Sequence, residues 1–154
     1  MIRRFLLALV LAFPSLLTQS ALAAGPLGLG LVLAGPTGLT GNYQFERDRS
    51  IAVALGWDDN DFQLHVDHLW YQRGLIKIDG ISIDVQLGLG LRWLQVDTRY
   101  EDDDTEIGVR APIGVSYTLR KVPLQLFGEL GPALILVDSS SFVVDIALGG
   151  RYYF

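Results

Sequence analysis

Residues 142–154 read Phe142-Val-Val-Asp-Ile-Ala-Leu-Gly-Gly-Arg-Tyr-Tyr-Phe154 and end the 154-residue sequence. Successive side chains of a β-strand point to opposite faces. Counting back from Phe154 in steps of two gives a face of apolar and aromatic residues, interrupted only by Gly150. The alternate face carries mostly small residues, together with Asp145 and Arg151. The stretch therefore predicts a strand whose two faces meet different surroundings.

The same alternation recurs along the chain, with turn-forming residues between the segments. It is cleanest from Ile81 to Leu94, where the apolar face opposes one with Ser82 and Asp84. We expect eight strands, at residues 27–33, 39–45, 51–57, 62–71, 81–94, 106–119, 124–136 and 142–154. The connection 73–80 is not assigned. Pro132 has to lie at a bulge or near a rim, because proline cannot donate to a sheet ladder.

The first residues have the pattern of a secretory signal peptide. A basic start, Met1 to Arg4, precedes a mostly apolar run that ends in the small-x-small segment Ala21-Leu-Ala23. The apolar run is shorter than the roughly 20 residues that span a bilayer. We therefore predict that residues 1–23 are removed after Sec-type export, and that residues 24–154 form one domain.

Composition excludes several classes of function. The chain has no cysteine, which rules out disulfides, thiolate zinc sites and cysteine nucleophiles. Its net charge of −5 argues against a nucleic-acid partner. The acidic run Glu101 to Asp104 offers hard ligands for a divalent cation, but it lacks the spaced ligands of an EF-hand loop, so we expect it to be solvated. We predict no catalytic residue, no cofactor and no metal.

The predicted fold is all-β: a closed, eight-stranded, antiparallel, up-and-down transmembrane β-barrel. Open sheet edges in lipid cost several kcal/mol for each unpaired backbone group, so the sheet has to close. A soluble carrier barrel would place the apolar face inside. Here the large apolar residues suit lipid, and small residues suit the narrow lumen of eight strands. Four aromatic residues are predicted at the membrane interface, namely Trp57, Trp70, Trp93 and Tyr117.

On this orientation, charged side chains of both signs point into the lumen. The predicted polar network consists of His65, Asp67, Asp84, Arg92, Arg110, Glu129, Asp145 and Arg151. Charges away from bulk water need partners, and a nearly balanced mixture supplies them. We therefore expect a structural network that plugs the barrel.

Two alternatives stay open for the lumen. The first is a lipid-modifying hydrolase: His65 and Asp67 share a face and form half of a hydrolytic triad, and the missing part is a nucleophile. Ser82 and Ser116 fall on lumen faces, but nothing in the sequence places either near His65. His68 faces lipid beside Trp70, where it suits the interface. A narrow channel is the second alternative, and it is disfavoured because the lumen looks filled.

The mature chain resembles the small eight-stranded outer-membrane barrels typified by the membrane domain of OmpA and by OmpX. Gly28 to Gly41 and Leu64 to Trp70 look closer still to a family of small outer-membrane β-barrel proteins of uncharacterised function. The resemblance implies the outer membrane of a Gram-negative-type bacterium, with lipid and lipopolysaccharide as neighbours. It also implies that Leu148, Tyr152 and Phe154 belong to a signal read by the barrel-assembly machinery.

The function expected from these observations is a non-enzymatic contribution to envelope integrity or surface interaction. OmpX-like proteins have long protruding strands and loops. Here the presumed outer loops at residues 35–38 and 58–61 are short. This difference weakens the case for an adhesin.

Overall fold

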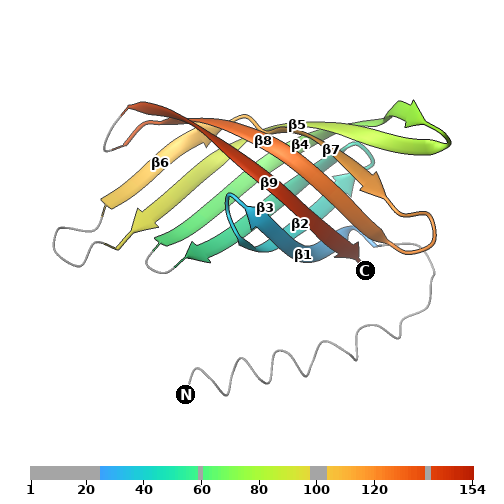
Figure 1. Ribbon diagram of the computed structural model, residues 1–154, viewed down its shortest axis with the longest axis horizontal. Helices are drawn as coiled ribbons and strands as arrows, with labels where there is room; N and C mark the ends of the chain where they lie inside the picture. Colours follow the sequence, from blue (N-terminus) through green and yellow to red (C-terminus); the bar gives the residue numbers. More distant parts are fainter. Residues whose placement is uncertain (1–24, 59–60, 98–103, 138–139) are drawn as a thin grey trace, which may run out of the picture.

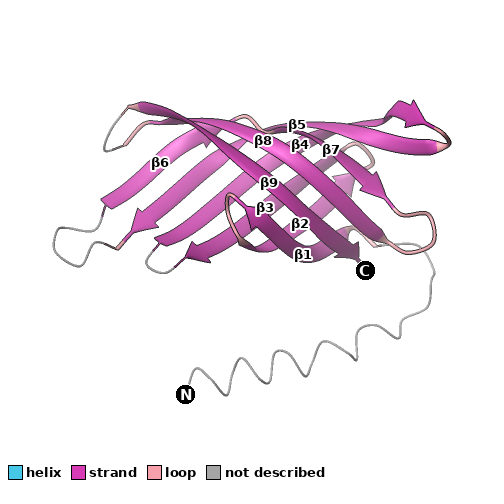
Figure 2. Cartoon of the chain, in the orientation of Figure 1, coloured by secondary structure: helices cyan, strands magenta, loops and turns pink. Residues whose placement is uncertain are grey.

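The computed structural model describes residues 25–58, 61–97, 104–137 and 140–154. The predicted signal peptide and most of the acidic run at 101–104 lie outside these residues. Nine antiparallel strands are present: β1 (Leu27–Ala34), β2 (Gly38–Glu46), β3 (Arg49–Asp58), β4 (Asp61–Ile78), β5 (Ile81–Val96), β6 (Asp104–Arg110), β7 (Ile113–Thr118), β8 (Leu124–Ile135) and β9 (Ser141–Tyr153). Figure 2 shows strands joined by loops, and no helix in the described residues is long and apolar enough to cross a membrane.

The strands form a ring of eight (Figure 1). Each strand from β1 to β5 pairs with the next, β8 pairs with β9, and β9 pairs with β1. Between β5 and β8 lie β6 and β7, and both of these pair with β5 on one side and β8 on the other. They are two parts of one strand of the ring. The predicted all-β, antiparallel, eight-stranded barrel is confirmed.

The break between β6 and β7 has a chemical cause. The pairing with β8 has the same register on both sides of the break, from Arg110 opposite Ala133 to Ile113 opposite Leu130. Pro112 has no N–H to donate, although its carbonyl accepts a hydrogen bond from Gly88 N at 2.7 Å. Pro132 lies in the interior of β8 opposite this break, with no shift of register. The sequence predicted a bulge or a place near a rim, and the structure has neither. The Pro132 carbonyl accepts a hydrogen bond from Ala111 N at 2.9 Å, but this proline has no N–H to return. Each proline therefore leaves one gap, Pro112 in the ladder with β5 and Pro132 in the neighbouring ladder between β8 and Ala111.

The unassigned connection 73–80 completes a hairpin. β4 continues to Ile78, beyond the predicted end at residue 71, and pairs with β5 up to Ile81. The register shifts between Gln72 and Ile76, around Gly74, whose φ is +60°. This left-handed conformation suits glycine and lets the strand bulge before pairing resumes. The hairpin then closes at Asp79 and Gly80, which both have positive φ.

The ring is uneven along its length. β1 ends at Ala34, opposite Ala147, while β9 begins at Ser141. The first residues of β9 therefore extend past β1 on that side, and Figure 1 shows the short β1–β2 turn lying within the length of its neighbours. The β1–β2 and β2–β3 pairs keep one register, and the β2–β3 register shifts only after Gln44.

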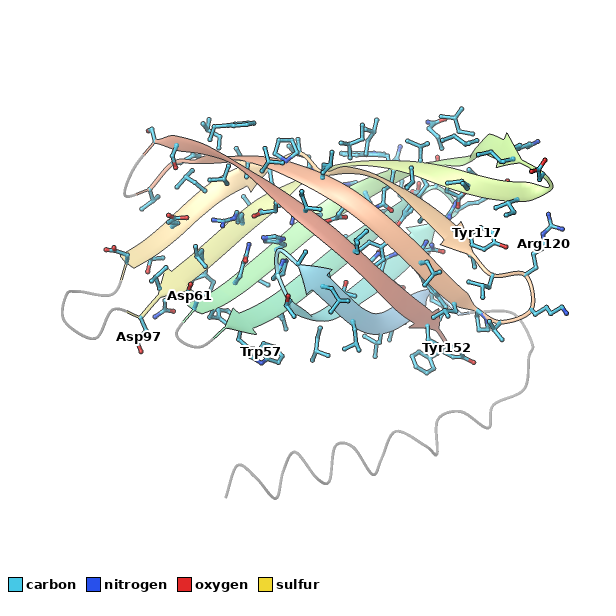
Figure 3. All side chains as sticks on the ribbon, viewed as in Figure 1. Trp57, Asp61, Asp97, Tyr117, Arg120 and Tyr152 are labelled. Carbon is cyan, nitrogen blue, oxygen red and sulfur yellow. The ribbon has the colours of Figure 1, made fainter. Side chains whose placement is uncertain are left out.

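The two faces of the wall differ as the alternation predicts. Large apolar side chains point away from the barrel, with Leu31 63% and Leu89 59% exposed. Polar side chains fill the inside, where His65 and Arg110 are each 1% exposed. In Figure 3, the outward-pointing Trp57 lies towards one end of the barrel and Tyr152 towards the other. The interior of this protein is therefore polar and its exterior apolar, the reverse of a water-soluble barrel.

Candidate functional site

Arg110 is the centre of the buried charges. It lies on β6, and its inward side chain reaches residues of β4 and β8 on either side of the ring. Its guanidinium donates to the Glu129 carboxylate at 2.9 Å and lies 3.6 Å from Asp67. It also contacts Nδ1 of His65. Charge-assisted hydrogen bonds of this kind are stronger than neutral ones.

A second arginine links the remaining charges. Arg92 on β5 donates to Glu106 at 3.0 Å and to Asp145 at 3.2 Å. The Asp145 carboxylate also lies 3.6 Å from Nε2 of His65. His65 thus joins the two arginine groups, and we call the set the charged cluster: His65, Asp67, Arg92, Glu106, Arg110, Glu129 and Asp145.

Two of the predicted lumen residues lie outside this cluster. Arg151 is buried, donates to the Thr40 hydroxyl at 3.0 Å and lies over the Phe127 ring at 3.9 Å. It forms no ion pair with any residue that the structure describes. Asp84 lies at the base of the β4–β5 hairpin, where it pairs with Arg73 at 2.7 Å. The structure therefore brings six of the eight predicted residues together.

A second buried cluster was not predicted. Asn42 donates to the hydroxyls of Tyr153 at 2.7 Å and Tyr71 at 3.2 Å, and Tyr153 donates to Gln125 at 3.0 Å. We call this set, with Ser50 and Ser116, the neutral cluster: Asn42, Ser50, Tyr71, Ser116, Gln125 and Tyr153. The alternation could have identified these residues, because they occupy inward positions. The predicted network contained only charged residues, so these neutral ones were not in it, and neither was Glu106.

Among the described residues, the side chains of the suggested hydrolytic triad are not brought together. Asp67 contacts Arg110, whereas His65 contacts Arg110, Asp145 and Gln63. Ser116 accepts a hydrogen bond from Gln125 in the neutral cluster, and the exposed Ser82 lies beside Gly74. No serine that the structure describes hydrogen-bonds to His65. His65 is also sealed from the solvent, so a substrate has no path to it.

Metal ligands are not gathered either. Across the described ranges, no three histidine, aspartate or glutamate side chains are placed to hold an ion. The acids of the charged cluster are engaged by arginine instead. The acidic residues 101–103 lie outside the described part of the chain.

Aromatic side chains gather on the outer wall towards both ends of the barrel. Trp93 packs edge-on against Phe62, with centroids 6.1 Å apart. On β4, His68 stacks on Trp70 at 4.3 Å. Figure 3 places Tyr117 and Tyr152 at the end opposite Trp57. Leu148 and Tyr152 on β9 lie on the outward face, and so does Phe154 directly after the strand, with the rings of Tyr152 and Phe154 5.2 Å apart.

Comparison with known proteins gives a likeness in fold. No protein-family model matches the chain, and no curated protein matches it in sequence. The structure is similar to the N-terminal β-barrel domain of Pseudomonas aeruginosa OprF, with a TM-score of 0.62 and 12% sequence identity. The match covers 86% of this chain and 100% of that domain. The closer resemblance to OmpX-like proteins, or to an uncharacterised family, stays a prediction. What the comparison and the geometry together establish is an eight-stranded β-barrel with the fold of that OprF domain and a polar, tightly bonded interior.

Proposed function

We propose that this chain is a small, non-enzymatic outer-membrane barrel that contributes to envelope integrity or surface interaction. The observation that carries the proposal is the inverted distribution of side chains: buried ion pairs fill the lumen, and large apolar residues cover the outside. Lipid is the solvent in which such an exterior is stable. The likeness to the OprF barrel domain supports the outer membrane as the compartment.

The dimensions of the outer wall support a membrane-spanning role. Aromatic residues of β4 lie at Phe62 and at Trp70, which are separated by about 27 Å along the strand. With a strand tilt of about 40°, the separation along the barrel axis is about 20 Å, close to the apolar band of bacterial outer-membrane barrels. Aromatic residues at both edges of such a band suit the two interfaces of a bilayer.

The charged cluster favours a lumen that is closed, and not one that conducts ions. Eight strands leave room inside only for side chains, and here those side chains are held by mutual ion pairs. An ion would have to replace several charge-assisted hydrogen bonds at once to pass Arg110. A planar-bilayer recording of the purified barrel should therefore show no discrete conductance steps, and such steps would favour a narrow channel.

The location and the fold are tested together in outer-membrane fractions. A closed barrel resists detergent until it is heated, so boiled and unboiled samples should migrate differently on a gel. The protein should show this shift and should sediment with outer-membrane markers. Recovery in the soluble periplasm without a shift would contradict the proposal and would point to a carrier with a bound ligand.

The non-enzymatic role is tested with a deletion strain. Loss of the protein should increase the entry of detergent or of a dye that the intact envelope excludes, and expression of His65→Ala should restore the barrier. Lipid composition should be the same with wild type and with His65→Ala. A specific acylated or deacylated lipid that disappears in the variant would support the hydrolase instead.

A further inference from the structure

The end of the barrel at which β9 finishes has a hollow. A cavity of about 350 Å³ opens there, and its lining includes Gln44, Arg47, Arg73, Thr118 and Tyr153. We call it the vestibule. Gln44, Thr118 and Tyr153 alternate with outward-facing neighbours on their strands, so the vestibule is the mouth of the lumen and not a groove on the outer wall.

The vestibule has a closed floor. Tyr153 is the member of the neutral cluster that lines the cavity, and its hydroxyl bonds to Asn42 and Gln125 behind it. Asn42 and Gln125 are themselves fully buried. A solute that enters the mouth therefore meets a hydrogen-bonded layer that spans the lumen. The vestibule can hold a ligand without passing it on.

The two charged side chains that line the vestibule are both arginines. Arg73 is held firmly: it donates to Asp84 at 2.7 Å and to the Arg47 carbonyl at 3.1 and 3.0 Å, and it lies 4.3 Å from the Tyr71 ring centroid. Asp84 offsets much of its charge. The Arg47 guanidinium forms no ion pair with any residue in the described ranges. In this lining, the charge of Arg73 is therefore largely balanced by Asp84, whereas Arg47 is free to pair with a ligand.

We propose that the vestibule binds a small, water-soluble anion that carries a phosphate group. The Arg47 guanidinium supplies the planar fork of donors that suits phosphate oxygens. The Gln44 amide and the Thr118 hydroxyl, which line the same cavity, add neutral donors. The Arg73 guanidinium is held against the wall by its hydrogen bonds, so it adds positive charge at the mouth without filling the cavity. The ligand comes from solution, because lipid headgroups border the outer wall, whereas Gln44 and Thr118 occupy inward positions of their strands and Arg47 lies in the exposed turn at the mouth.

The site goes beyond the proposed envelope role, and its test is independent of that role. Inorganic phosphate is titrated into the folded barrel in a sugar-headed detergent, with binding followed by calorimetry or by the ³¹P NMR line width. Wild type should bind saturably. Arg47→Gln should weaken binding about tenfold or more, the effect of losing one charge-assisted hydrogen bond.

The matched control is Arg49→Gln. Arg49 lies two residues from Arg47, but it is half exposed, pairs with Glu46 at 3.4 Å and does not line the vestibule. This variant should bind phosphate within about twofold of wild type, as expected for an exposed ion pair. Retention of the heat-dependent gel shift verifies that each variant is folded.

Three results would overturn the proposal. The first is the absence of saturable phosphate binding by wild type. The second is an equal loss in Arg47→Gln and Arg49→Gln, which would mean diffuse attraction to a positive rim. The third is binding that appears only when phosphatidylglycerol is added to the micelles, which would place the phosphate site on the lipid-facing wall.

Discussion

The charged cluster and the neutral cluster fill the same lumen with different chemistry. Arg110 and Gln125 are both almost completely buried, yet one is bonded to charged partners and the other to hydroxyls. The neutral cluster lies beside the end of β9, and the charged cluster lies further from it, on residues of β4, β5, β6, β8 and β9. A buried charge that loses its partner costs far more than a buried neutral group does. The two parts of one plug should therefore differ greatly in their tolerance of substitution.

The largest effect is expected at the centre of the charged cluster. Arg110→Met should lower the free energy of unfolding by about 3–5 kcal/mol, because it leaves the Glu129 and Asp67 carboxylates without their cation. Urea unfolding of the barrel in lipid vesicles measures this change. The exposed Arg49→Met is the control and should stay within about 0.5 kcal/mol of wild type. An equal loss of stability in Arg110→Met and Arg49→Met would contradict the idea that a buried, paired charge is the more costly one to remove.

Neutralising the two carboxylates as well should recover most of the stability that Arg110→Met loses. In the triple variant Arg110→Met, Asp67→Asn and Glu129→Gln, no uncompensated charge remains around position 110. Replacement of a buried ionic group by neutral residues of similar size is often close to neutral in stability. The same unfolding measurement should place the triple variant within about 2 kcal/mol of wild type. A triple variant less stable than Arg110→Met alone would show that packing, and not unpaired charge, explains the first effect.

A smaller effect is expected in the neutral cluster. Tyr153→Phe removes the hydroxyl that accepts from Asn42 and donates to Gln125, and it should cost about 1–3 kcal/mol. Tyr152→Phe is a matched control, since the neighbouring ring points outward (Figure 3). Its unfolding free energy should change by about 0.5 kcal/mol or less. If Tyr153→Phe destabilised the barrel as much as Arg110→Met, the two clusters would not differ as proposed.

The smallest effect is expected where the charged cluster meets solvent. The Glu106 side chain is 30% exposed at its contact with Arg92, which keeps Asp145 as a second partner. Glu106→Gln should therefore cost about 1 kcal/mol or less. Glu129→Gln, which changes a more buried partner of Arg110, should cost more. The reverse order would show that exposure does not govern the strength of these pairs.

Much of the fold could be predicted because a strand has a period of two. The alternation from Ile81 to Leu94 identifies β5 and both of its faces, and the polarity of those faces decides which one lies inside. The positions of six strands were predicted to within a few residues on the same grounds. Prediction was weaker where a backbone feature changed the period. Gly74 inserts a bulge into β4, and Pro112 removes a donor from the strand formed by β6 and β7.

The candidate site was predicted only as a set of inward positions. Alternation places His65, Arg92 and Arg110 in the lumen, but it contains no information about which strands face each other across it. The pairing of His65 with Asp145, and not with Asp67, depends on how the ring closes. Glu106 and the neutral cluster were missed for a related reason: their importance comes from partners on strands far away in the sequence.

The sequence by itself determined the strands, their two faces and the inverted distribution of polar and apolar residues, because these depend on neighbours one or two positions apart. Only the tertiary structure decided the partners of each buried side chain, the neighbouring gaps left by Pro112 and Pro132 in two adjacent ladders, and the vestibule that Arg47 and Arg73 line. Those features arise from the register between strands and from the closure of β9 on β1. Register is a property of the whole ring, so no single stretch of sequence contains it.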